Sequence, residues 1–234
     1  METLERERQS ALESRDFLTY MCLTVRAIHE DNERKWRFSG LGFAAGYERT
    51  WDGPIVSLLD TDPFENGTPP FQILRPDLEE LLTTSLGPNY DDKRLLQLDG
   101  SLMISREGFV VAAARVYRVD PERVADDHGL PGGSLKQKFG FKNGRRIGTG
   151  TLRSKAAAYG LPEGCITGRI RTNGDLFVFE AQRNPAGEGV IGRTVLAPTA
   201  DQEEANPIGP YASSILRLRE SLHQEESVPL AAEG

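Results

Sequence analysis

Residues 109–117, Phe-Val-Val-Ala-Ala-Ala-Arg-Val-Tyr, constrain the fold more than any other segment because they are almost continuously apolar. A strand with one face in water alternates apolar and polar residues, whereas a strand that is covered on both faces does not. Residues 101–105 predict a second strand, and Arg106-Glu107-Gly108 predicts the turn between the two. The pair therefore predicts a sheet that other elements cover on both sides.

Helices and further strands are predicted around this pair. Apolar residues at helical spacing predict a helix over residues 3–30, and Pro76-Asp77 opens a second one with a leucine stripe. The remaining segments predict a turn entering a strand over 32–46, a strand at 55–59, a loop over 60–72, a turn or two of helix over 91–98, a helix over 151–160, a hairpin of strands near 164–171 and 175–181, a loop-rich stretch over 182–210 and an amphipathic helix from 211 to 224. This order predicts an α/β fold, a mixed central β-sheet flanked by helices.

We divide the chain into three regions. Residues 1–75 are expected to be a helix and strand region packed on the main domain, and residues 76–182 the core of that domain. The core contains a polar, glycine-rich excursion at 119–147, and such long excursions are usually functional or disordered. Residues 183–234 are expected to form a loop, the C-terminal helix and a frayed tail.

The composition excludes several classes of protein. The 234 residues hold 28 Lys plus Arg against 35 Asp plus Glu, a net charge of −7, which argues against a general nucleic-acid coat. The two cysteines, Cys22 and Cys165, cannot frame a disulfide scaffold or a four-thiolate zinc site, and the three histidines are scattered. The sequence has no apolar run near the roughly 18–20 residues that span a bilayer, and no signal-peptide core. We expect a cytoplasmic protein with reduced thiols and no membrane partner.

Residues 134–155 differ from the rest of the chain in charge. The segment reads SLKQKFGFKNGRRIGTGTLRSK and has no acidic residue. Its seven cations are Lys136, Lys138, Lys142, Arg145, Arg146, Arg153 and Lys155. The Gly148–Thr151 run falls at the predicted start of a helix, where free backbone N–H groups and the helix dipole favour anions. Two interpretations remain open here: a phosphate site, and a solvated basic loop followed by a capped surface helix.

The order of segments around Asp99-Gly100 is more informative than this turn pair alone, which is common in ordinary turns. The segments are, in order, Leu98-Asp99-Gly100-Ser101-Leu102-Met103-Ile104, then Val110-Val111-Ala112-Ala113-Ala114, then Gly150-Thr151-Leu152-Arg153-Ser154-Lys155-Ala156-Ala157 and a strand hairpin. This order resembles the diadenylate cyclase domain of the cyclic di-AMP synthases. That family has an Asp-Gly-Ala motif on one strand edge, an alanine-rich partner strand and a Gly-Thr-Arg-His-Arg motif that opens a helix. The resemblance covers residues 76–182.

The chain departs from the family pattern at three places. Ser101 stands where the family has alanine. If Leu152 is counted as a one-residue insertion, Ser154 stands where the family has histidine, and a cation remains on each side of it. Some members hold a metal with a glutamate in the final hairpin, but the corresponding stretch here, Arg171-Thr172-Asn173-Gly174, has no carboxylate.

The resemblance implies a reaction and a role for individual residues. In the family two domains face each other, each with one ATP, and an aspartate with Mg²⁺ or Mn²⁺ activates the 3′-hydroxyl of one ATP for attack on the α-phosphorus of the other. Pyrophosphate leaves, and cations with the helix N-terminus stabilise the triphosphate charge. By this mapping Asp99 is the catalytic and metal-binding residue. The implied nucleotide-binding residues are Gly100, Ser101, Tyr117, Gly150, Thr151, Arg153, Ser154 and Lys155. Tyr117 is a candidate to stack on adenine, and packing at the strand end is the alternative.

Three functions follow from these observations. The first is a diadenylate cyclase that condenses two ATP to cyclic di-AMP plus pyrophosphate, in a homo-oligomer with face-to-face active sites. The second is a sensor on the same fold that binds ATP or cyclic di-AMP without catalysis, which the lost histidine would allow. The third is an α/β scaffold whose basic loop meets an acidic protein.

Overall fold

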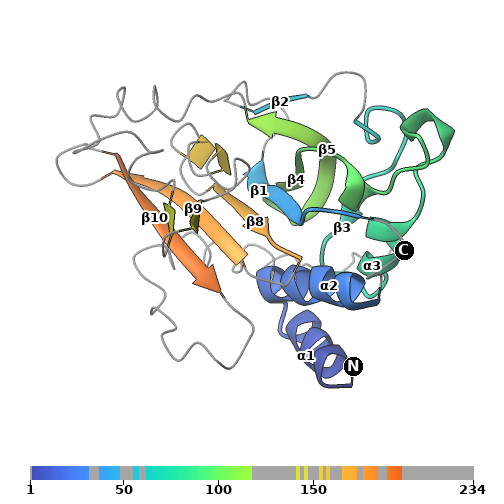
Figure 1. Cartoon of the computed structure of the whole chain (residues 1–234), viewed down its shortest axis with the longest axis horizontal. Helices are drawn as coiled ribbons and strands as arrows, with labels where there is room; N and C mark the ends of the chain where they lie inside the picture. The colour runs from blue at the N-terminus through green and yellow to red at the C-terminus, as the bar shows by residue number, and fades with distance from the viewer. Residues whose placement is uncertain are drawn as a thin grey trace, which may run out of the picture.

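A mixed β-sheet forms the centre of the fold (Figure 1). The computed structural model describes residues 2–31, 37–47, 55–57, 62–117, 141–142, 145–146, 153–154, 157–158, 165–172, 176–183 and 189–196. In these residues the sheet has the strand order β10-β9-β8-β1-β4-β5-β2, and β3 pairs with β5. Its strands are β1 (Leu41–Tyr47), β2 (Ile55–Ser57), β3 (Phe71–Gln72), β4 (Ser101–Ser105), β5 (Phe109–Tyr117), β8 (Ile166–Ile170), β9 (Leu176–Arg183) and β10 (Gly189–Leu196). A separate ribbon pairs β6 (Phe141–Lys142) with β7 (Arg145–Arg146).

The predicted α/β class is confirmed. β1 and β4 run parallel, β1 and β8 run antiparallel, and helices pack on the sheet. The helices are α1 (Glu2–Glu13), α2 (Phe17–Asp31) and α3 (Leu78–Thr83), with the 3₁₀ helices η1 (Pro88–Tyr90) and η2 (Leu95–Gln97). Residues 153–154 and 157–158, inside the helix predicted over 151–160, are also helical, and these four residues are together called the second helical segment. Within the described part of the chain, no helix is both long enough and apolar enough to cross a bilayer.

The first helical region is two helices, so the prediction of one helix over residues 3–30 is wrong. Arg15 has φ 56°, a left-handed conformation that ends α1. Asp16 then caps α2, since its carboxylate accepts hydrogen bonds from the backbone N–H of Thr19 at 3.2 Å and from the Thr19 hydroxyl at 2.8 Å. The helical period of the apolar residues continues through this break, which is why periodicity alone did not reveal it.

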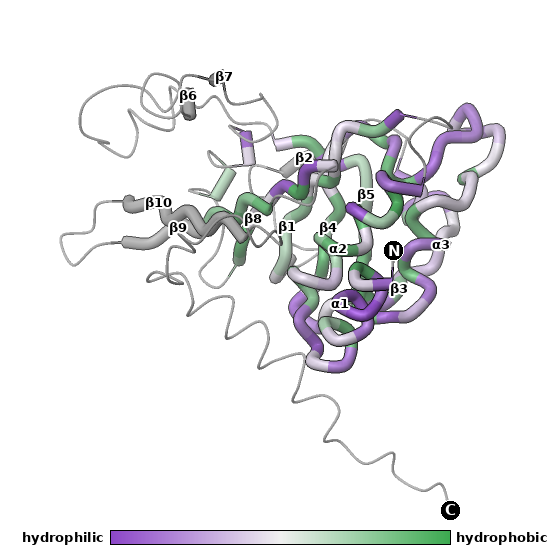
Figure 2. The backbone as a smooth tube through the Cα atoms, turned by 60° about the horizontal axis from the view of Figure 1, so that its bottom comes forward, coloured by the Kyte–Doolittle hydropathy of each residue, from purple (hydrophilic) through white to green (hydrophobic). Residues whose placement is uncertain are grey.

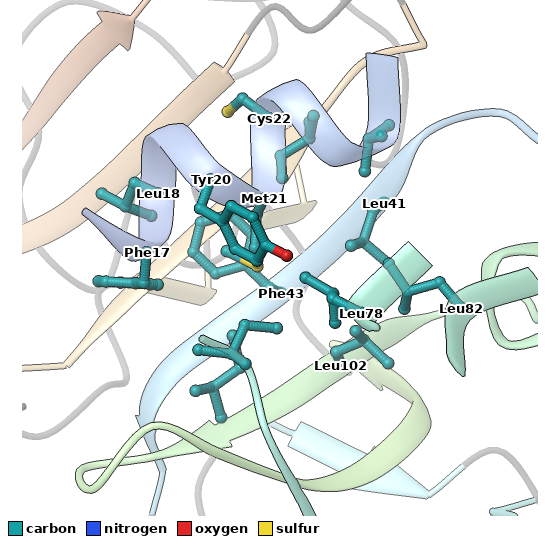
Figure 3. Packing of buried hydrophobic residues seen from close by; sticks show 14 of the residues in the cluster. Phe17, Leu18, Tyr20, Met21, Cys22, Leu41, Phe43, Leu78, Leu82 and Leu102 are labelled. Carbon is teal, nitrogen blue, oxygen red and sulfur yellow. The ribbon is translucent and has the colours of Figure 1, made fainter. Parts of the chain in front are cut away.

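α2 covers one face of the sheet. Figure 3 shows its apolar side chains against those of β1 and β4. The residues buried there include Phe17, Leu18, Met21, Phe43 and Leu102. α1 lies outside α2 and is mainly hydrophilic (Figure 2), with Ala11 as its buried residue. Complete burial of each large side chain contributes about 1.5–3 kcal/mol, so this layer supplies much of the driving force for folding.

Small residues pack on the other face of the sheet. Ala44 of β1 is in register with Met103 of β4, and Met103 with Ala112 of β5. These three side chains pack with Tyr117 and with Ala157 from the second helical segment. Alanine on both sides of this contact, at Ala44, Ala112 and Ala157, lets the helical residues approach the sheet closely.

The strand predictions are confirmed at the centre and wrong at one edge. The strands expected at 101–105 and 109–117 are β4 and β5, and the expected hairpin is β8 and β9. β10 lies inside the stretch predicted as loop-rich and pairs antiparallel with β9 along its whole length. Pro185 and Pro198 flank β10 rather than interrupt it, so they mark its ends. Most of the 119–147 excursion and the helix predicted from 211 to 224 lie outside the described residues.

Candidate functional site

The start of β4 is pressed against the backbone of β5 at Gly100. This residue has φ 114°, a conformation that side-chain-bearing residues rarely adopt. A Cβ at this position would lie 2.7 Å from the carbonyl carbon of Ala114 and 2.7 Å from the carbonyl oxygen of Arg115. The glycine next to Asp99 is therefore required by the fold. Asp99 itself is exposed to solvent at the end of the sheet.

β5 bulges at the point where it meets Gly100. Ser101 is in register with Arg115 and Met103 with Ala112, so two residue steps along β4 match three along β5. Ala114, which lies in this bulged stretch of β5 between Ala112 and Arg115, has φ 54° and is buried. Bulges and left-handed non-glycine residues are found preferentially at functional sites, where they redirect the chain.

Asp62 holds this bulge through a hydrogen bond and an ion pair. It is 1% exposed, and its carboxylate accepts a hydrogen bond from the backbone N–H of Ala113 at 3.1 Å. The same carboxylate lies 2.8 Å from Nη2 of Arg115, which also pairs with Glu65 at 2.6 Å. Such partners offset the cost of burying a carboxylate. Asp62 is not among the predicted site residues, because it falls in the predicted loop at 60–72, where no periodic pattern distinguishes it from an exposed loop aspartate.

Tyr117 connects the start of β4 to the second helical segment. Its buried hydroxyl donates a hydrogen bond to the carbonyl oxygen of Phe43 at 2.9 Å, and the hydroxyls of Ser101 and Ser154 hydrogen-bond to it. Burial raises the pKa of Tyr117, so the phenol stays protonated. The carbonyl oxygen of Ser154 in turn accepts a hydrogen bond from Thr167 of β8 at 2.6 Å. Two motifs far apart in the sequence thus meet at one buried hydroxyl.

Two arginines of the hairpin lie beside this cluster and were not among the predicted site residues. Arg169 is in register with Gly42, and Gly42 is in register with Ser101. Nη2 of Arg169 donates to the carbonyl oxygen of Ser39 at 2.9 Å and lies 3.1 Å from its hydroxyl oxygen. Burial, and then the charge of Arg171, lower the pKa of Arg169. Only the register of three strands reveals this proximity, because the sequence places Arg169 far from Ser101.

The structure brings together four of the predicted site residues and leaves others undescribed. Those that meet are Gly100, Ser101, Tyr117 and Ser154. Asp99 and Arg153 are exposed neighbours of this group along the chain. The predicted residues Gly150, Thr151 and Lys155 lie outside the described residues, so their phosphate-binding role stays a prediction. Tyr117 is 5% exposed, which favours packing over stacking on adenine, the two alternatives that the sequence left open.

Asp99 is the residue that the resemblance assigns to a metal ion. In the described ranges, no three or more His, Cys, Asp or Glu side chains are grouped closely enough to hold a metal ion. Mg²⁺ is usually bound through one or two carboxylates, with substrate phosphates and water completing its shell. The exposed carboxylate of Asp99 is compatible with that arrangement.

Comparisons of the chain with protein-family models, with curated proteins and with solved structures find no match. The resemblance to diadenylate cyclases therefore rests on the motifs and the order of the elements.

Proposed function

We propose that the chain binds ATP where β4, β5 and the second helical segment meet, and that it condenses two ATP to cyclic di-AMP and pyrophosphate. The observation that carries the proposal is the junction at Tyr117. Ser101, from the Asp-Gly-Ser motif, and Ser154, from the Arg-Ser-Lys motif, reach the same hydroxyl group. The motifs that the resemblance assigns to one nucleotide site are therefore adjacent, although they are distant in the sequence.

Asp99 and Arg153 are exposed beside the junction, and with the other residues of their motifs they supply the groups that this chemistry needs. In each transfer a 3′-oxygen forms a bond to the α-phosphorus of the other ATP, the bond from that phosphorus to the pyrophosphate oxygen breaks, and the 3′-hydroxyl gives up its proton to the carboxylate of Asp99. Asp99 is the carboxylate for the 3′-hydroxyl and for Mg²⁺ or Mn²⁺, which when bound supplies Lewis acidity. Arg153, Lys155 and the backbone at Gly150 and Thr151 are the groups for the triphosphate.

The proposed reaction requires two copies of the chain, in the cytoplasm where ATP is available. Each chain contains one Asp-Gly-Ser and one Arg-Ser-Lys motif, whereas the cyclic product has two equivalent phosphodiester bonds. A two-fold arrangement with the same surface from each copy presents each 3′-oxygen to the other α-phosphorus. Turnover per chain is therefore expected to rise with protein concentration until the dimer saturates.

A sensor that binds ATP or cyclic di-AMP without turning it over is the second candidate, and Ser154 favours it. This residue occupies the position of the family's histidine, is 2% exposed, and is held against Tyr117. A serine in this environment offers no group that titrates near neutral pH. The binding residues could then remain while proton transfer is lost.

Incubation of the purified chain with ATP and Mg²⁺ or Mn²⁺, followed by mass spectrometry for cyclic di-AMP, tests the proposal. We expect product from the wild type, none from Asp99→Asn, and ATP binding by both. Asp91→Asn is the matched control, because it removes an exposed carboxylate away from the junction. A wild type that binds ATP but forms no product with either metal would favour the sensor, and one that binds neither ATP nor cyclic di-AMP would refute both candidates.

A further inference from the structure

Arg169 and Arg171 lie on the face of the sheet that carries the candidate site. Side chains alternate along a strand, and the neighbours Ile166 and Ile170 are buried in the core on the α2 side. Thr167 belongs to the opposite set, with Arg169 and Arg171, and its hydroxyl donates to the carbonyl oxygen of Ser154. The two guanidinium groups therefore share a face with Ser154.

Glycines separate these arginines from the start of β4. Gly42 lies between Arg169 and Ser101 in the sheet, and a Cβ at Gly42 would be 2.5 Å from the hydroxyl oxygen of Ser101. The Ser101 hydroxyl therefore lies above Gly42, on the side of β4 that faces β1 and β8. Nearer the end of the sheet, the Cβ position of Gly40 is 3.1 Å from the Cα of Arg171. Since neighbouring strands are about 4.8 Å apart, β8 and β4 are roughly 10 Å apart, a gap that an arginine side chain and a phosphate group can bridge together.

The positive charge of this pair is not balanced within the described part of the chain. Arg169 is only partly exposed and contacts the neutral oxygen atoms of Ser39, and Arg171 lies 4.7 Å from the ring centroid of Phe177. Neither arginine forms an ion pair with a carboxylate among the described residues. Two nearby cations, one of them half-buried, are costly unless an anion joins them. Guanidinium groups bind phosphate oxygens through paired, charge-assisted hydrogen bonds.

We propose that Arg169 and Arg171 form a phosphate subsite beside Ser101 that holds part of the phosphate chain of the nucleotide. This inference rests on the proposed nucleotide site and adds to it a set of cations on β8, separate from the cations of residues 134–155. The subsite is built by the register of β8, β1 and β4.

Binding of tripolyphosphate and of ATP to the full chain, measured by titration calorimetry, tests the subsite. Arg171→Gln is the decisive variant, since its side chain is exposed and its loss leaves the core intact. We expect both ligands to bind about tenfold more weakly, because charge-assisted hydrogen bonds are lost. Arg169→Gln should act in the same direction, and Arg171→Lys should keep part of the affinity, because the charge remains while the paired hydrogen bonds are lost. Arg6→Gln on exposed α1 is the matched control for charge and should leave both affinities unchanged, and melting temperatures establish that each variant is folded.

The outcomes separate this inference from the proposed function. Unchanged affinities in Arg171→Gln, with ATP binding lost in Arg153→Ala, would overturn the subsite and leave the nucleotide site in place. A wild type that binds tripolyphosphate through Arg171 but does not bind ATP would support the subsite and refute the nucleotide proposal. A wild type that binds neither ligand would overturn both.

Discussion

Replacement of Gly100 by alanine tests the close contact between the start of β4 and the bulge of β5. The alanine must adopt φ 114°, and its Cβ must fit against the backbone of Ala114 and Arg115 at 2.7 Å. A non-glycine residue in a sparsely populated conformation costs about 1–3 kcal/mol. An overlap with backbone atoms, which cannot rotate away as a side chain can, adds about 1–3 kcal/mol. We therefore expect Gly100→Ala to lower the free energy of unfolding by about 2–6 kcal/mol.

Gly67→Ala is the matched control for this prediction. Gly67 has φ 103°, close to that of Gly100, but a Cβ there has nothing within 4 Å. The control therefore bears the conformational cost alone, about 1–3 kcal/mol. The difference between the two variants isolates the contact with β5.

Urea unfolding followed by circular dichroism measures both free energies, and thermal melting checks them. A chain of this size loses about 2–4 °C of melting temperature per kcal/mol, so Gly100→Ala should melt on the order of 10 °C below the wild type. Equal losses in Gly100→Ala and Gly67→Ala would refute the reasoning, because the backbone of β5 would then not confine the Asp-Gly-Ser turn.

Three further predictions concern side chains around the same sheet. Burial raises the pKa of Tyr117 above its ordinary 10.0, so above pH 10.0 the unfolded chain loses this proton before the folded chain does, and the free energy of unfolding falls. The wild type should therefore lose stability with rising pH more steeply than Tyr117→Phe. Parallel declines of the two proteins would contradict this. Asp62→Ala should lower the free energy of unfolding by about 3 kcal/mol, because it leaves Arg115 and the Ala113 N–H without their buried acceptor. Asp62→Asn should lower it less in the same urea titration, and an equal loss would argue against the hydrogen bond from the Ala113 N–H. Asp16→Ala should cost about 1 kcal/mol through loss of the α2 cap, and an unchanged midpoint of unfolding would show that the cap does not contribute.

Local patterns were sufficient for the elements at the centre of the sheet. β4 and β5 have the bounds that their apolar runs and the Arg106-Glu107-Gly108 turn predict. The hairpin of β8 and β9 follows from Asn173-Gly174 between two apolar runs. These strands and turns can be predicted because burial on both faces and tight turns each restrict the residue types at consecutive positions. The break at Asp16 also had a local signal, an aspartate three residues before Thr19, which the stronger helical period concealed.

For the candidate site, the sequence supplied the motif residues, and the structure supplied the reasons for them. Gly100 was recognised as part of a motif, but the reason for a glycine there became visible only with the backbone of β5 against it. The sequence leaves two roles open for Tyr117 at the end of its strand, packing and stacking on adenine, and its burial favours packing. The roles of Asp99 and Arg153 in nucleotide chemistry remain predictions from the resemblance.

By itself the sequence determined the α/β class, the central antiparallel pair of β4 and β5, and the turn at residues 106–108 that joins them. It did so because hydrophobic period, turn chemistry and helix capping act between residues that are close in the chain. Only the tertiary structure decided that β1 lies between β8 and β4, that Asp62 supports the bulge of β5, and that Arg169 lies one glycine away from Ser101. These relations depend on strand order and register, which arise from packing between distant segments, and a residue's neighbours in the sequence carry no record of them.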